Sequence, residues 1–176
     1  PNTQQPIKLS IWYPEGKPCD NAKLCLSESA RLDQAMLLSH GAMGSARELN
    51  WVGYATASQG FITVGINHFG ESWAYGKDSI QPHAATKIWR RASEISAAID
   101  LLQRNQASSQ EPAHLFSHQV NWQQLTAIGF SSGGSTVITL GGGKYNPEQA
   151  ATYCASERSK GDLGCRYAKN LPEHAI

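Results

Sequence analysis

The 176-residue sequence lacks the features that mark several common classes of protein. Lys and Arg together number 15 and Asp and Glu 14, and the sequence has no basic cluster and no basic stripe interleaved with aromatic residues. Nucleic acid is therefore not an expected partner. No apolar run approaches the ~20 residues that a membrane-spanning helix needs, so no membrane span is expected either. The sequence also has no internal repeat and no low-complexity tract.

Cysteine is scarce, and its spacing is not that of a zinc site or a redox motif. The four cysteines form two local groups, Cys19 with Cys25 and Cys154 with Cys165, and neither group has C-x-x-C spacing. Two short-range disulfides are the simplest interpretation, four reduced thiols are the alternative, and three pairings are formally possible. Because disulfides persist in oxidising compartments, the first interpretation predicts a periplasmic or secreted protein.

Four runs of residues predict the strands of one α/β domain, and the chain is too short for two large domains. Residues 7–13 alternate apolar and polar, which is typical of a half-exposed antiparallel strand. Residues 35–38, 61–66 and 125–129 are mostly apolar without alternation, as expected of strands buried on both faces of a parallel sheet.

Predicted helices alternate with these strands. Residues 46–59 and 136–140 are expected to be helical, and residues 88–102 carry the clearest stripe of apolar residues at spacings of three and four. Arg90 and Arg91 lie off that stripe and are expected on a solvated face. Strands and helices that alternate after an antiparallel start predict a mainly parallel sheet with helices on both faces.

Polar stretches fill the rest of the chain. Residues 17–33 and 106–121 are predicted to be surface loops, the second with a turn at Leu115-Phe116. Residues 146–176 show no strong period and are predicted to form a surface excursion that the second cysteine pair clamps.

The stretch around Ser131 has the pattern of a nucleophile elbow. Residues 129–133, Gly-Phe-Ser-Ser-Gly, fill the pattern G-x-S-x-G between a predicted strand and a predicted helix. Glycines two residues on either side of the serine leave room for a strained turn that exposes the hydroxyl. The backbone N–H of Ser132, directly after the serine, is then a natural oxyanion donor. The alternative is a glycine-rich turn that contains a serine by chance.

Three loops are expected at one edge of this sheet, because ligands of parallel sheets bind beyond the carboxyl ends of the strands. They are residues 39–44, residues 67–72 and the elbow. The small residues within 39–44 let backbone N–H groups turn toward a bound anion.

These segments, taken in order, resemble the α/β-hydrolases. The matching residues are Leu-Ser-Ile-Trp-Tyr-Pro at 9–14, Leu-Ser-His-Gly at 38–41, Ser-Gln-Gly-Phe at 58–61 with Asn-His at 67–68, and Gly-Phe-Ser-Ser-Gly-Gly at 129–134. Within that superfamily the sequence is most similar to the dienelactone-hydrolase-like and platelet-activating-factor-acetylhydrolase-like serine esterases. The resemblance covers about residues 7–145.

The resemblance implies a set of site residues. Ser131 would be the nucleophile, and the backbone amides of Ala42 and Ser132 would form the oxyanion hole. His40 is expected to shape the loop that carries this hole. The expected site-lining residues are His40, Met43, His68 and Phe130. True dienelactone hydrolases use cysteine as the nucleophile, so serine favours ordinary ester hydrolysis.

The family presents its triad in the order serine, acid, histidine. Asp162 lies between two glycines in the predicted excursion, and His174 has no strand ahead of it, so both are poor candidates. His83, His114 and His118 are expected at the surface. The resemblance therefore implies a single domain over 1–176 that is incomplete at its C-terminus, with the remainder as a second chain or an unseen segment.

Together these patterns favour a serine esterase that cleaves a small ester, a lactone or a short-chain lipid ester through an acyl-enzyme on Ser131. The expected partner is a small-molecule ester, and neither a metal nor an organic cofactor is expected. A non-catalytic binding module of the same fold and a peptidase that uses the same machinery are the alternatives.

Overall fold

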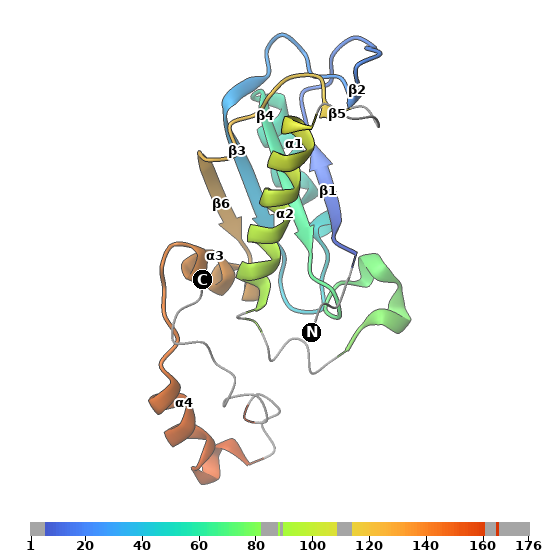
Figure 1. The fold of residues 1–176 in the computed structure, drawn as a ribbon. Coiled ribbons are helices and arrows are strands. Elements are labelled where there is room, and N and C mark those ends of the chain that lie inside the picture. The colour runs from blue at the N-terminus through green and yellow to red at the C-terminus, as the bar shows by residue number, and fades with distance from the viewer. Residues whose placement is uncertain (1–5, 82–87, 89, 109–113, 161–164, 166–176) are drawn as a thin grey trace.

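The computed structural model describes residues 6–81, 88, 90–108, 114–160 and 165. Its main sheet is formed by β1 (Lys8–Trp12), β3 (Arg31–Ser39), β4 (Phe61–Asn67) and β6 (Leu125–Gly129). Within the described residues these four strands have the order β1-β4-β3-β6 (Figure 1). Strands β3, β4 and β6 run parallel, and β1 pairs antiparallel with β4. The predicted α/β fold with a mainly parallel sheet is confirmed.

The two central strands are buried on both faces, as their apolar sequences predicted. β4 is buried from Ile62 to Asn67, and β3 is buried over its last three residues. β6 lies at an edge of the sheet and pairs with β3 alone within the described residues. Because the three strands are parallel, the loops that follow them leave the sheet at the same edge.

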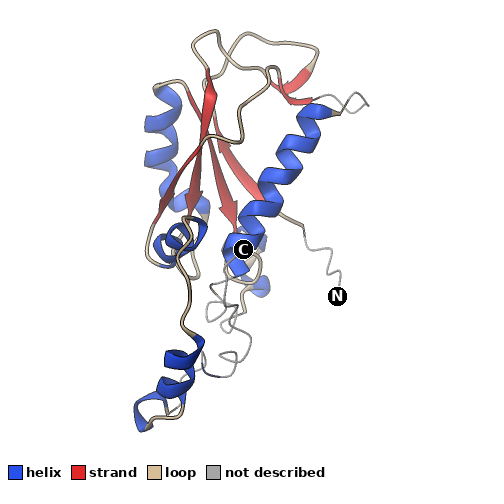
Figure 2. Cartoon of the chain, turned by 60° about the vertical axis from the view of Figure 1, so that its left-hand side comes forward, coloured by secondary structure: helices blue, strands red, loops and turns tan. Residues whose placement is uncertain are grey.

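Helices cover both faces of the sheet (Figure 2). α1 (Asn50–Ser58), which follows the 3-10 helix η1 (Ala46–Leu49), packs on one face, and α2 (Arg90–Ala107) packs on the other. α3 (Ser132–Leu140) follows β6 directly. Two further 3-10 helices, η2 (Trp73–Tyr75) and η3 (Lys77–Ser79), come after β4. No described helix is both long enough and apolar enough to cross a membrane.

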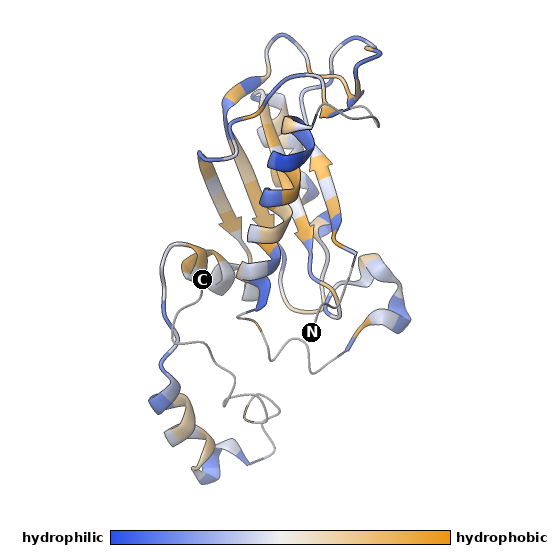
Figure 3. Ribbon diagram, viewed as in Figure 1, coloured by the Kyte–Doolittle hydropathy of each residue, from blue (hydrophilic) through white to orange (hydrophobic). Residues whose placement is uncertain are grey.

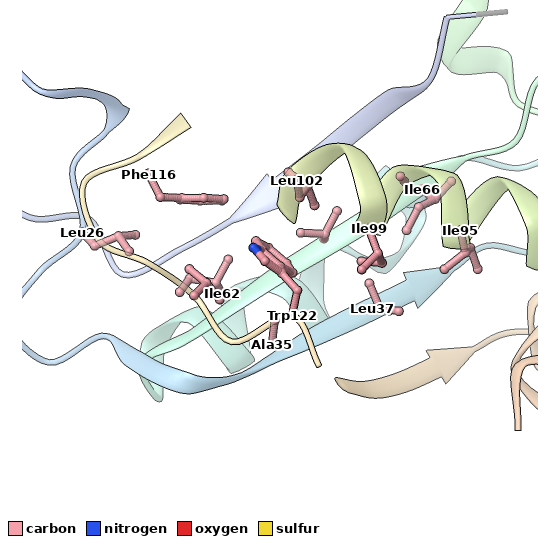
Figure 4. Packing of buried hydrophobic residues seen from close by; sticks show 13 residues of the cluster. Leu26, Ala35, Leu37, Ile62, Ile66, Ile95, Ile99, Leu102, Phe116 and Trp122 are labelled. Carbon is pink, nitrogen blue, oxygen red and sulfur yellow. The ribbon is translucent and has the colours of Figure 1, made fainter. Parts of the chain in front are cut away.

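The larger hydrophobic cluster fills the space between α2 and the sheet (Figure 4). Ile95, Ile99 and Leu102 of α2 pack in this cluster with Leu37 and Ile66 of the strands. Each such aliphatic side chain contributes roughly 1.5–3 kcal/mol when fully buried. A smaller cluster joins α1 and η1 to the opposite face of the sheet. Figure 3 shows the corresponding apolar colouring along the strands.

Two segments that were predicted to be surface loops contain strands. β2 (Ala22–Leu24) and β5 (His114–Phe116) form a parallel two-stranded sheet, and β3 begins at Arg31, four residues before the predicted start. Phe116, predicted to lie in a turn, is buried, and its ring centroid lies 5.9 Å from that of Trp122. Strands of three residues are too short to show a period of two, so the pattern did not reveal them.

Both cysteine pairs that the sequence favoured form disulfides. The Cα–Cα distances are 5.8 Å for Cys19–Cys25 and 5.4 Å for Cys154–Cys165, which lie within the usual range. The second disulfide begins at the end of α4 (Pro147–Cys154), which packs against the 3-10 helix η5 (Glu157–Ser159) and lies apart from the sheet (Figure 1). The excursion over 146–176 lies only partly within the described residues, and its extent stays a prediction.

Candidate active site

Ser131 lies in the tight turn between β6 and α3, and its backbone is strained. Its φ is 53° and its ψ is −120°, a backbone conformation that residues other than glycine rarely adopt. Such a conformation costs on the order of 1–3 kcal/mol and persists only where the surroundings fix it. The residue is exposed and caps the N-terminus of α3, beside the positive end of the helix dipole. The turn therefore has the strand–serine–helix geometry that G-x-S-x-G predicts.

Two glycines of the elbow are required by close backbone packing. A Cβ added at Gly129 would collide with the backbone of Gly133, and a Cβ added at Gly133 would collide with the carbonyl oxygen of Ser39. The first approach closes the elbow on itself, and the second joins the start of α3 to the end of β3. The G-x-S-x-G pattern predicted a steric role for these two glycines, and the structure shows which atoms they make room for.

The 39–44 loop lies directly against the elbow. A Cβ placed on Gly41 would lie 3.2 Å from Cδ1 of Phe130 and 3.5 Å from Cβ of Ser131. Phe130 is 63% exposed and Met43 is 38% exposed, so both present apolar surface at this edge of the sheet. Two loops that are about 90 residues apart in sequence thus meet around one serine.

The two backbone amides predicted to form the oxyanion hole belong to these two loops, Ala42 to the 39–44 loop and Ser132 to the elbow. Ala42 is exposed, and its N–H has no acceptor among the described residues. Ser132 is the first residue of α3, and amides in the first turn of a helix have no partner within the helix. Met43, next to Ala42, has a φ of 60°, so the 39–44 loop carries a strained residue as the elbow does.

His40, a residue of the 39–44 loop, is buried and uses both ring nitrogens in hydrogen bonds. Its Nε2 accepts the backbone N–H of His68 at 3.2 Å, so its Nδ1 carries the proton and donates to the carbonyl oxygen of Gly41 at 2.6 Å. Burial lowers the pKa of His40 to about 3, and the neighbouring His68 adds to this shift. Because the ring is 0% exposed and both of its nitrogens are hydrogen-bonded, it holds the loop in place from the protein interior.

Ser39, His68 and Glu94 form a hydrogen-bonded chain with the order of a Ser-His-acid triad. Ser39 Oγ lies 3.0 Å from His68 Nε2, and His68 Nδ1 lies 2.7 Å from Glu94 Oε2. Ser39 and His68 are each 1% exposed, so a substrate cannot reach this hydroxyl. Burial lowers the pKa of His68 well below its usual range and raises that of Glu94 to about 7. These three hydrogen-bonded side chains link β3, the loop after β4 and α2 inside the protein.

Arg91, which was predicted to lie on a solvated face of α2, is fully buried. Its Nε and Nη2 donate to the two carboxylate oxygens of Glu71 at 3.1 and 2.5 Å. Its Nη1 donates to the carbonyl oxygen of His40 at 2.5 Å, and Nη2 also donates to that of Gly41 at 3.3 Å. Arg91 precedes Ile95 by four residues and therefore shares its buried face, a spacing that could have revealed its burial.

Within the described residues, Ser131 has no histidine partner. Ser131 Oγ makes no hydrogen bond to any described histidine. His118 is exposed as predicted, whereas His114, predicted at the surface, is half-buried with its Nδ1 3.2 Å from the carbonyl oxygen of Asn105. His83, predicted at the surface, and the two poor candidates for the triad, Asp162 and His174, lie outside the described residues. Within the described part of the chain, no group of His, Cys, Asp or Glu side chains is arranged to hold a metal ion.

Comparisons with known proteins give a fold and no family. No protein-family model and no curated protein matches this sequence. A solved structure with a similar fold is the ferulic acid esterase from Streptomyces cinnamoneus, with a TM-score of 0.51 and 16% sequence identity. The match covers 76% of this chain and 47% of that chain, so this chain spans about half the length of its structural neighbour. At this level of identity the likeness shows the fold alone, an α/β fold with helices on a mixed sheet.

Proposed function

We propose that this chain carries the nucleophile and the oxyanion hole of a serine ester hydrolase. The observation that carries the proposal is the backbone of Ser131, which is held in a strained turn that exposes the serine beside the 39–44 loop. Strain of this kind gathers at sites where it serves a ligand or a reaction. The similar fold of the Streptomyces ferulic acid esterase supports ester hydrolysis as the reaction.

In the proposed mechanism, Ser131 Oγ attacks the acyl carbon of the ester while a histidine accepts the hydroxyl proton. The carbonyl oxygen becomes an oxyanion, which the N–H groups of Ala42 and Ser132 stabilise. The histidine then gives the proton to the leaving alcohol as the ester C–O bond breaks, which leaves an acyl-serine. A water molecule then attacks the acyl carbon while the histidine accepts one of its protons. The histidine gives this proton to Ser131 Oγ as the bond between the acyl carbon and Oγ breaks, which releases the carboxylic acid and restores the serine.

The substrate we propose is a small ester, a lactone or a short-chain lipid ester. Serine as the nucleophile favours this chemistry over the thiol chemistry of true dienelactone hydrolases. The proposed compartment is the periplasm or the extracellular space, because the two disulfides persist where the surroundings are oxidising.

The histidine and the acid of the triad are proposed to come from outside the described residues, in a C-terminal remainder of the same hydrolase. The outer edge of β6 supports this, because no described strand pairs with it. A groove of about 450 Å³ runs beside it, and its apolar lining includes Ile95, Ile99, Val137 and Leu140. An edge strand presents unpaired backbone N–H and C=O groups with which a further segment can pair. An intact mass of the active protein under denaturing conditions shows whether a second polypeptide accompanies this chain.

A fluorophosphonate probe tests the nucleophile directly, because it reacts with activated serines. We expect the active protein to be labelled at Ser131, and we expect Ser131→Ala to abolish both labelling and ester hydrolysis, by a factor of about a thousand or more. Ser135→Ala, which removes an exposed hydroxyl one turn further along α3, is the matched control and should behave as wild type. Hydrolysis that survives in Ser131→Ala would refute the assignment.

The two alternatives give different results in the same experiment. A non-catalytic module, which the lack of a described base at Ser131 would favour, should remain unlabelled. A peptidase should be labelled but should turn over amides as readily as the matching esters.

A further inference from the structure

The carbonyl oxygen of Gly41 accepts three hydrogen bonds. It accepts from the ring of His40 at 2.6 Å, from the backbone N–H of Gly44 at 3.4 Å and from Nη2 of Arg91 at 3.3 Å. The preceding carbonyl, that of His40, accepts from Nη1 of Arg91. The carbonyl of Gly41 belongs to the peptide unit that joins Gly41 to Ala42.

The geometry of a peptide unit converts this fixed carbonyl into a fixed donor. A trans peptide is planar, and its C=O and N–H point in opposite directions. When the guanidinium of Arg91 holds the Gly41 oxygen toward the protein interior, the N–H of Ala42 is directed the opposite way. Ala42 is exposed, and a Cβ on Gly41 would lie 3.5 Å from Cβ of Ser131, so we infer that this N–H faces the solvent beside the elbow.

We propose that Arg91 is a positioning residue that aims the Ala42 amide into the oxyanion hole, with Glu71 holding the guanidinium in place. This inference rests on the proposed ester hydrolysis at Ser131. Glu71 is 3% exposed and binds the guanidinium through both carboxylate oxygens, so the fork cannot rotate away from the loop. The donors that Glu71 leaves available are the ones that bind the carbonyls of His40 and Gly41.

Stability alone does not account for this arrangement. Replacing a buried ion pair by well-packed apolar residues is often neutral or stabilising, so the pair is weak grounds for a purely structural role. The 39–44 loop also carries Met43 at a φ of 60°, a conformation that needs external support. An arginine that pins two successive carbonyls supplies this support at the position where an oxyanion donor must be rigid.

The proposal is tested with the double variant Arg91→Met/Glu71→Leu, because Arg91→Met alone would leave Glu71 buried and unpaired. We expect the double variant to fold, as judged by circular dichroism and thermal unfolding, and to lose 10- to 100-fold in kcat with KM changed less than threefold. A full loss of one oxyanion donor costs about 10²–10³ in kcat, and a misaimed donor should cost somewhat less. The single variant Arg91→Lys should lose less kcat than the double variant does, because an ammonium group can bind one of the two carbonyls but lacks the forked geometry of the guanidinium.

Arg90→Met is the matched control, since Arg90 is the neighbouring arginine of α2 and its side chain is 45% exposed. It should retain kcat within about twofold. A folded double variant with kcat within threefold of wild type, or with a raised KM and an unchanged kcat, would overturn the proposal.

A second measurement does not depend on turnover. Hydrogen exchange of the Ala42 amide, followed by NMR, should change in Arg91→Lys and in the double variant but not in Arg90→Met. Unchanged exchange in both Arg91 variants would also overturn the proposal. Failure of the proposed function gives a different result, because wild-type protein would then show neither fluorophosphonate labelling at Ser131 nor ester turnover while the loop still responded to Arg91.

Discussion

At Ala42 the proposed chemistry belongs to the main chain, and substitutions can therefore separate the N–H from the side chain. Ala42→Pro removes the N–H outright and fixes the local φ, so we expect kcat to fall by about 10²–10³. Ala42→Ser keeps the donor and should stay within about tenfold of wild type. Ester hydrolysis by the two purified, folded variants is the measurement. Equal activities would mean that the second oxyanion donor lies elsewhere.

Gly133 and Gly134 are adjacent glycines of α3 with opposite steric surroundings. A Cβ at Gly133 would collide with the Ser39 carbonyl, whereas at Gly134 the nearest neighbour is the Gly129 carbonyl oxygen at an ordinary 3.6 Å. Gly133→Ala should therefore lower the free energy of unfolding by about 1–3 kcal/mol, as overpacking does. Gly134→Ala should raise it by up to about 1 kcal/mol through better helix propensity. Urea denaturation of both variants measures the contrast, and similar changes in the two would contradict the close packing of elbow and β3.

At the scale of elements, the loops after β3 and β4 are joined to α2 by buried groups whose charge depends on pH. His40 has its pKa lowered from 6.5 to about 3, and His68 has its pKa lowered in the same direction, so both stay neutral in the folded protein. Below pH ~6.5 the unfolded chain takes up protons that the folded chain does not. The free energy of unfolding is therefore unaffected by these two histidines above pH ~6.5, and it decreases as the pH falls below that value. Glu94, with its pKa raised to about 7, acts in the opposite sense between pH ~4.5 and ~7.

The contribution of His40 can be isolated with His40→Gln, whose amide can keep one hydrogen bond to the loop. Arg91, Glu48 and His68, which influence His40 in the wild type, are present in both proteins, so the wild-type minus variant difference removes most of their own contributions to stability. We expect this difference in unfolding free energy to shrink by up to about 1.4 kcal/mol for each pH unit between pH 6.5 and 4.5. Chemical denaturation at four pH values provides the measurement. A difference that does not vary with pH would show that His40 titrates normally.

The elements differ in how far the sequence could predict them. β4 and the elbow were predictable because continuous apolar residues and the spacing of Gly129, Ser131 and Gly133 act within one short segment. β2 and β5 were not, because three-residue strands show no period and pair with partners about 90 residues away. The burial of Arg91 had a local signal in its spacing from the apolar stripe. Its ion pair with Glu71 had none, because a charge in the loop after β4 does not reveal its partner on α2.

For the molecule as a whole, the two disulfides differ in how they connect to the core. Cys19–Cys25 closes a segment that is followed at once by Leu26, which is buried in the main hydrophobic cluster. Cys154–Cys165 begins at the last residue of α4, a helix that has no buried residue and lies apart from the sheet (Figures 1 and 2). A crosslink raises global stability only when the segment that it restrains unfolds together with the core.

Removal of each disulfide by a pair of Cys→Ala substitutions should therefore have unequal effects on the unfolding of the sheet. Chain entropy alone assigns about 2 kcal/mol to a loop of the size closed by Cys19–Cys25, and slightly more to the larger loop of Cys154–Cys165. We expect removal of Cys19–Cys25 to lower Tm by about 4–8 °C. Removal of Cys154–Cys165 should change Tm by less than about 2 °C while making residues 146–160 much more susceptible to protease. Loop size alone predicts the reverse order, so an equal or larger Tm shift in the second variant would mean that the α4 segment folds as part of the core.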